Sequence, residues 1–222
     1  MKVAILSLVL GAAGSLPLSA QTLTAPASAM PAEAAAALSR AVRLYADGSA
    51  HVSPFTQIYT PSGFTTARRE SGSVWIQAPQ RLRFEYAAPE RTIYTYDAGE
   101  GRFFSPEDKQ LTVRRLSSEE KARLPIVFLT DPAELAREYV ISVEEASGGA
   151  PSRLLLKPRV VRADLAWLRL SISKEGAIRE LSFEDGGGNR TEFRFEAWRR
   201  ENARPTSDFR ISGPPGTRIL EN

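Results

Sequence analysis

The chain of 222 residues has no cysteine and only one histidine, His51, and these shortages exclude several kinds of site. Without a thiol there is no disulfide bond, no cysteine nucleophile, no cysteine ligand for zinc and no cysteine to carry a lipid. A serine hydrolase would have to use His51, which stands beside Ser49 and Ser53 without the sequence context of a nucleophilic serine. We therefore expect no catalytic residues, no metal ligands and no cofactor.

A long hydrophobic run is also absent outside the N-terminus. There, Met1-Lys2 is a short positive segment, Val3 to Ala13 is almost entirely apolar, and Ser19-Ala20 supplies small residues for cleavage. This pattern predicts a secretory signal peptide over residues 1–20, with Ala29 as an alternative end. The apolar run is shorter than the roughly 20 residues that cross a membrane, so we expect an exported protein without a membrane span.

No segment concentrates charge of one sign. The 29 basic and 26 acidic residues are interspersed and leave a formal net charge of +3, so nucleic acid is not an expected partner. The carboxylates fall in turns and on polar strand faces, where solvated charge is ordinary. A secreted enzyme on a β scaffold, such as a glycosidase, is a weaker hypothesis because the sequence places no pair of carboxylates together.

Strand patterns dominate the rest of the chain. From Arg81 to Tyr86 apolar and charged residues alternate strictly, which is typical of a strand with one buried face. Many short strand patterns, separated by turn residues at intervals of about 8–12 residues, favour an antiparallel sandwich or barrel. The glycine-rich segment 185–189 is interpreted as a hairpin turn. Later strands are expected at Tyr139–Val143, Arg153–Lys157, Trp167–Ser173, Ile178–Glu184, Arg190–Trp198, Phe209–Ile211 and Arg218–Leu220.

Helical signals are few. Residues 21–30 are rich in Ala, Ser, Thr and Pro and are expected to form a flexible mature N-terminus, while residues 31–222 are expected to form one domain. Pro31 stands at a favourable first helical position, and the apolar residues after it recur at helical spacing: Ala34, Leu38, Val42 and Tyr45. A capping box at 117–120 and the pair Asp131-Pro132 predict two further helix starts.

Several short segments occur in a characteristic order. Among them are Phe55-Thr56-Gln57, Gly72-Ser73-Val74-Trp75, Leu82-Arg83-Phe84-Glu85-Tyr86, Asp97-Ala98-Gly99, Leu156-Lys157-Pro158, Ile178-Arg179-Glu180-Leu181 and Thr191-Glu192-Phe193. Their order and spacing, over residues 32–220, resemble those of the LolA family of lipoprotein carriers, although no single segment is specific.

The resemblance implies a mainly β fold, an incomplete, half-open antiparallel β-barrel whose mouth is covered by a helical lid. It also implies a soluble periplasmic carrier, expected to be a monomer. Such a carrier receives acylated lipoproteins from an ATP-driven inner-membrane exporter, shields their acyl chains and delivers them to an outer-membrane receptor. A periplasmic lipid-sensing or regulatory binding module of the same fold is the alternative function.

On this resemblance, an apolar concavity is expected to hold the acyl chains. Its expected lining is Leu38, Val42, Val74, Ile76, Leu82, Phe84, Tyr86, Ile93, Ile126, Phe128 and Leu129; the alternative is that these residues only fill a core.

The lid of many family members is tied down by an arginine before the first proline of the meander, and this chain has Ala78 there instead. Strand alternation places the nearby Arg81 and Arg83 on the opposite face from Leu82, which makes them poor substitutes. The lid is therefore expected to be held mainly by apolar contacts.

Overall fold

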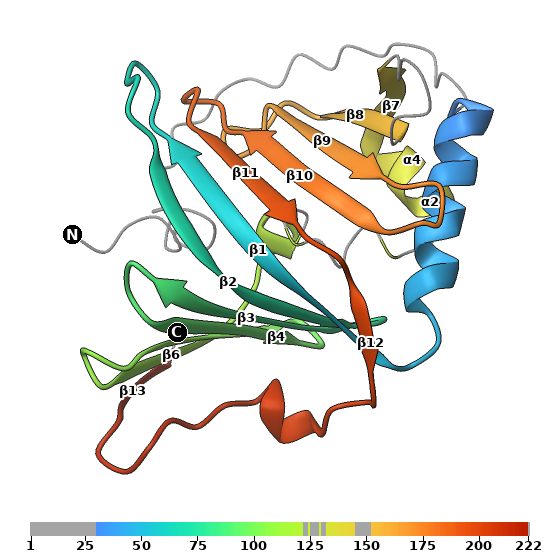
Figure 1. Ribbon diagram of the computed structural model, residues 1–222. Helices are drawn as coiled ribbons and strands as arrows, with labels where there is room; N and C mark the ends of the chain where they lie inside the picture. The colour runs from blue at the N-terminus through green and yellow to red at the C-terminus, as the bar shows by residue number, and fades with distance from the viewer. Residues whose placement is uncertain (1–29, 122–123, 125–128, 130–131, 145–151, 222) are drawn as a thin grey trace.

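The computed structural model describes residues 30–121, 124, 129, 132–144 and 152–221 (Figure 1). The expected signal peptide and residues 21–29 of the expected flexible segment lie outside this part of the chain. In the described part, no helix is both long enough and apolar enough to cross a membrane.

The described residues form one sheet of thirteen strands, in the order β13-β6-β5-β4-β3-β2-β1-β11-β10-β9-β8-β7, with β12 beside β1. All pairs are antiparallel except β13 with β6. The strands are β1 (Ala50–Thr60), β2 (Arg68–Gln77), β3 (Arg81–Ala88), β4 (Thr92–Asp97), β5 (Glu100–Ser105), β6 (Gln110–Arg115), β7 (Tyr139–Glu144), β8 (Ser152–Pro158), β9 (Trp167–Ile172), β10 (Ile178–Glu184), β11 (Arg190–Phe195), β12 (Arg199–Glu201) and β13 (Arg218–Glu221).

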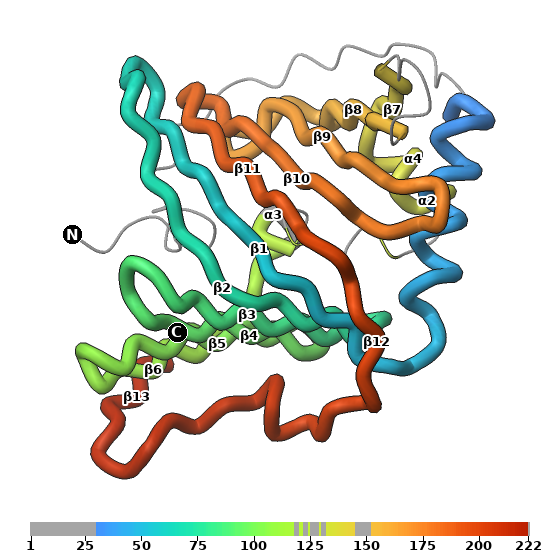
Figure 2. Tube along the Cα trace, viewed as in Figure 1, coloured from blue at the N-terminus to red at the C-terminus, as the bar shows by residue number. Residues whose placement is uncertain are grey.

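The sheet is strongly bent. In Figures 1 and 2, β3 to β6 run crosswise to β9 to β11, and the long strands β1 and β2 pass from one half to the other. The bend follows from the right-handed twist that accumulates across many strands. The expected mainly β fold, a half-open barrel with helices at its open side, is confirmed.

Helix α2 (Ala32–Tyr45) packs against β7, β8 and β9 and against the short helix α4 (Pro132–Glu138). Its buried residues are Ala34, Ala37, Leu38, Ala41 and Tyr45. The predicted stripe was wrong at Val42, which is half-buried and lies outside the core cluster. Three alanines on the buried face let the helix backbone approach the sheet closely, so the contact stripe runs through small side chains instead of the larger valine.

The capping box is confirmed at α3 (Ser118–Lys121). The Ser117 N–H donates to a carboxylate oxygen of Glu120 at 2.9 Å, and the Glu120 N–H donates to the Ser117 hydroxyl at 3.2 Å. The predicted hairpin turn also exists, between β10 and β11. There, one carboxylate oxygen of Asp185 accepts hydrogen bonds from the N–H groups of Gly187 and Asn189 at 2.9 and 3.0 Å.

The C-terminal segment, residues 202–217, runs below β3 to β6 in Figure 1 before β13 joins β6. A strand predicted at Phe209–Ile211 is wrong, because this segment contains the 3-10 turn η2 (Thr206–Asp208) and no strand before β13. Arginines of the sheet bind the segment in place of a neighbouring strand: Arg81 donates to the Thr206 hydroxyl at 3.0 Å, Arg83 to the carbonyl of Asp208 and Arg102 to the carbonyl of Ile211 at 2.8 Å.

Gly176 joins the sheet to α2. It has φ +97°, and a Cβ at this position would lie 2.4 Å from the carbonyl oxygen of Arg40 in α2. A residue with a side chain would be strained at this positive φ, and its Cβ would push the helix away, so the position requires glycine.

Replacing Gly176 by alanine should therefore lower the free energy of unfolding and loosen α2. Gly63→Ala is the matched control, because Gly63 also has positive φ (+76°) but has nothing within 4 Å of the added Cβ. We expect Gly63→Ala to lower the free energy of unfolding by about 1–2 kcal/mol from backbone strain alone, and Gly176→Ala to exceed it by about 1 kcal/mol or more. Urea unfolding measures both, and equal losses would contradict the close contact with α2.

Candidate ligand-binding interior

The pairing of β3 with its neighbours divides the sheet into two faces. Leu82 lies opposite Ile76 on one side and Tyr96 on the other, and Phe84 lies opposite Val74 and Tyr94 in the same way. Directly opposed residues share a face, so the apolar residues of all three strands gather on one side of the sheet, which we call the inner face.

Phe55 of β1 is the centre of an aromatic group on the inner face. Its ring centroid lies 5.1 Å from that of Phe84, 5.0 Å from that of Tyr86 and 6.0 Å from that of Phe193. Phe55 and Tyr86 belong to strands on either side of β2, and the residue between them in β2 is Gly72. Strands two apart are separated by about 9–10 Å, and the two rings span this distance above Gly72, which has no side chain.

The expected acyl-site residues mostly come together. Seven of them are buried in one apolar cluster: Leu38, Val74, Ile76, Leu82, Phe84, Tyr86 and Leu129. Two others, Ile126 and Phe128, lie outside the described residues. Val42 is half-buried on α2 and is not part of the cluster.

The prediction that Ile93 shares a sheet face with Leu82 and Phe84 is wrong. It lies opposite Glu85 of β3 and Phe104 of β5, on the outer face of the sheet, while its neighbours Tyr94 and Tyr96 point inward. Both faces of β4 carry side chains that are able to fill an interior, so the sequence pattern does not decide which face is inward. In the structure the larger tyrosine rings fill the interior.

The predicted lining did not include the half of the inner face that β8 to β11 form. In β8 to β11 the inward residues are leucines and phenylalanines that continue the same buried cluster: Leu154, Leu156, Leu168, Leu170, Leu181, Phe183, Phe193 and Phe195. The signal that identifies Leu82 and Phe84, alternation of apolar and charged residues, is also present in these strands, for example in Thr191 to Phe195.

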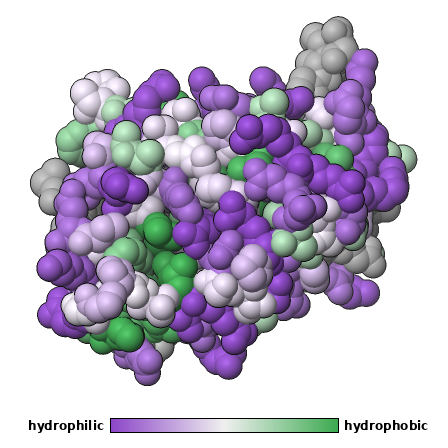
Figure 3. Space-filling view, turned by 60° about the horizontal axis from the view of Figure 1, so that its bottom comes forward, coloured by the Kyte–Doolittle hydropathy of each residue, from purple (hydrophilic) through white to green (hydrophobic). Residues whose placement is uncertain are grey.

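The interior is closed in this structure. Val74, Ile76 and Leu82 have 0% exposure and Phe84 has 1%. Figure 3 shows a largely hydrophilic surface with hydrophobic residues gathered in one area at its lower left, so most apolar side chains are withdrawn from this face. In the described part of the chain, no group of three or more acidic, histidine or cysteine side chains is arranged to hold a metal ion.

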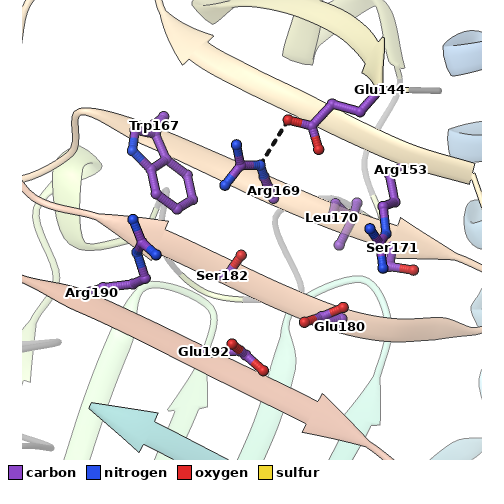
Figure 4. A pocket seen from close by; sticks show the side chains of 10 residues that line it. All are labelled: Glu144, Arg153, Trp167, Arg169, Leu170, Ser171, Glu180, Ser182, Arg190 and Glu192. Carbon is purple, nitrogen blue, oxygen red and sulfur yellow. Dashed lines mark hydrogen bonds and ion pairs between the residues drawn. The ribbon is translucent and has the colours of Figure 1, made fainter. Parts of the chain in front are cut away.

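A polar hollow of about 380 Å³ lies on the outer face of β8 to β11 (Figure 4). Trp167 stands there beside two guanidinium groups, Arg169 at 4.5 Å and Arg190 at 5.4 Å from its ring, and Arg169 also pairs with Glu144 at 2.8 Å. Burial raises the pKa of the Glu180 carboxyl in this hollow. Charged residues of both signs line it, so it offers no place to shield an acyl chain.

Ala78, the position of the absent family arginine, lies between β2 and β3 and is half-buried against the core cluster. A hollow of about 370 Å³ beside it is lined in part by Arg81 and Asp97. Arg81 and Arg83 bind the C-terminal segment on the outer face, at Thr206 and at the carbonyl of Asp208.

Comparison with known proteins gives consistent results. Residues 49–212 match the family model described as outer membrane lipoprotein carrier protein LolA. Outer-membrane lipoprotein carrier proteins from Xanthomonas axonopodis pv. citri and Alkalilimnicola ehrlichii are 32% identical over 167 residues and 29% identical over 197 residues. These matches cover 75% and 87% of this chain and 79% and 89% of those proteins. A conserved protein from Thermus thermophilus has a similar fold, with a TM-score of 0.55 at 12% identity over 86% of this chain and 99% of that one.

Truncation to alanine should lower the free energy of unfolding more on the inner face than on the outer face. Leu82→Ala removes a fully buried side chain from the inner cluster and should lower the free energy of unfolding by about 2–5 kcal/mol. Ile93→Ala, on the half-buried outer face, should lower it by less than about half as much, because less apolar surface is lost. Chemical unfolding of both variants tests the assignment, and an equal or larger loss for Ile93→Ala would contradict it.

Proposed function

Because this chain belongs to the LolA family of outer-membrane lipoprotein carriers, we propose that it is a soluble periplasmic carrier that shields the acyl chains of lipoproteins. It takes them from an inner-membrane exporter and delivers them to an outer-membrane receptor. The observation that supports this most is the continuous apolar inner face of a bent sheet. Burial contributes about 0.8 kcal/mol per methylene, so an acyl chain of about fifteen methylenes gains on the order of 12 kcal/mol in such a site.

Acyl chains reach the inner face when α2 moves. The two ends of α2 are held differently: Tyr45 at its C-terminal end contacts the rings of His51 and Trp198 at 4.9 and 5.4 Å, and its hydroxyl accepts a hydrogen bond from the Ile178 N–H at 3.3 Å. Toward the N-terminal end the buried face consists mainly of alanines, which remove little apolar surface from water. In this proposal α2 swings about Tyr45, and the rings of the inner face rearrange around the ligand.

Binding of an acylated peptide should raise the melting temperature, because only the folded state provides the apolar interior. At a ligand concentration about 100 times Kd the expected stabilisation is about 2.7 kcal/mol. Thermal unfolding with a synthetic triacylated lipopeptide, compared with the same peptide without acyl chains, measures the effect. Equal melting temperatures with the two peptides would contradict the carrier function.

Introducing Ala78→Arg should restore a polar tie to the lid. In many family members the arginine at this position faces the lid, and a guanidinium is able to satisfy several carbonyl groups at once. We expect slower amide hydrogen exchange in α2, corresponding to about 1–3 kcal/mol of added protection, together with weaker acyl binding. Ala78→Lys is the control that keeps the charge but lacks the planar fork. Unchanged exchange in the arginine variant would mean that position 78 does not face the lid.

A further inference from the structure

The inner face changes character along β2. Val74 and Ile76 are apolar, Gly72 leaves the space for the rings above it, and the next two inward residues toward the start of the strand are Glu70 and Arg68. Glu70 is only 8% exposed, and it lies opposite Gln57 of β1, which is 2% exposed. One end of an apolar interior therefore carries buried polar side chains.

The polar groups at this end are close to one another. The Tyr86 hydroxyl donates to the Gln57 side-chain oxygen at 2.6 Å, and Arg68 pairs with one carboxylate oxygen of Glu70 at 3.3 Å. Burial raises the pKa of the Tyr86 hydroxyl, and the neighbouring Glu70 carboxylate and Tyr94 raise it further. Thr92 lies directly opposite Tyr86 on β4.

Several atoms of this group have no hydrogen-bond partner. They are the second carboxylate oxygen of Glu70, the hydroxyl of Thr92 and Nε of Arg68, each buried within the described part of the chain. Buried polar atoms are almost always paired, so three unpaired ones at one end of one interior need an explanation. A ligand that enters the interior and supplies the missing partners is such an explanation.

We infer that Glu70 and Thr92 form a polar anchor for the amide bond that joins an acyl chain to a peptide, with the chain itself lying along Val74, Ile76 and Phe84. This inference rests on the carrier function proposed above. An amide offers one N–H, which the free oxygen of Glu70 accepts, and one carbonyl, to which the Thr92 hydroxyl donates. Both orphaned atoms are satisfied by one linkage.

Charge at the anchor favours a neutral amide over other head groups. The positive charge of Arg68 offsets that of Glu70, so an ammonium group meets no net negative charge. A fatty-acid carboxylate has no donor for the free oxygen of Glu70, and an ester has none either. The anchor therefore distinguishes an amide-linked acyl chain from free fatty acids and from ester-linked chains alone.

Matched threonine substitutions test the anchor. Thr92→Val removes the unpaired inner hydroxyl, whereas Thr95→Val removes an equally buried, unpaired hydroxyl that lies on the outer face of the same strand, opposite Arg83. Neither change breaks an internal hydrogen bond, so both empty proteins should melt at or above the wild-type temperature. A role confined to the fold would instead lower the melting temperature of Thr92→Val.

The ligands are two synthetic lipopeptides with the same three chains: in one the palmitoyl chain is amide-linked beside two ester-linked chains, and in the other an (E)-alkene isostere replaces that amide. We expect the wild type to bind the amide-linked form about tenfold more tightly, and Thr92→Val and Glu70→Leu to lose about tenfold for that form only. Thr95→Val should bind like the wild type. Equal weakening for both lipopeptides, or none in either variant, would overturn the anchor while leaving the carrier function intact. A wild type that binds neither lipopeptide would overturn the carrier function itself.

Discussion

The contact between Phe55 and Tyr86 above Gly72 is the feature on which the rest of the structure depends. It brings rings from β1 and β3 within 5.0 Å across an intervening strand, and Phe84 and Phe193 join them from the two halves of the sheet. A Cβ on residue 72 would lie 1.9 Å from the carbonyl oxygen of Glu85, so the backbone there also requires glycine. The two halves of the bent sheet join at this point, and their apolar inner residues come into contact here.

Each face of the bent sheet is completed by a different part of the chain. Helix α2 covers part of the inner face through alanines, whereas the C-terminal segment covers the outer face of β3 to β5 through arginine hydrogen bonds and the buried ring of Phe209. Asp97, only 5% exposed, receives both Arg81 and Arg210 and so ties the segment to the sheet. The outer cover is thus held largely by hydrogen bonds and ion pairs, and the inner one largely by apolar packing.

The sequence predicts the parts that depend on local pattern. The alternation around Leu82 and Phe84, the capping box at Ser117 and the hairpin turn after β10 are all present as expected. What it does not decide depends on packing between distant segments. Ile93 faces outward because tyrosines of the same strand fill the interior, and α2 docks through alanines because close approach favours small side chains. The path of the C-terminal segment is set by arginines more than a hundred residues earlier in the chain. The polar anchor has no local signal at all, since Glu70 and Thr92 reach the same end of the inner face only through the register of β2, β3 and β4.

The central claim, that acyl chains lie on the inner face, is tested most directly by methyl NMR with a triacylated lipopeptide that carries a nitroxide near the end of one acyl chain. The account predicts strong paramagnetic broadening of the methyl signals of Val74 and Leu82, which face inward, and sharp signals from Ile93 and Leu155, which face outward. Broadening of the outward methyls, with Val74 and Leu82 unaffected, would place the acyl chain elsewhere and contradict the account.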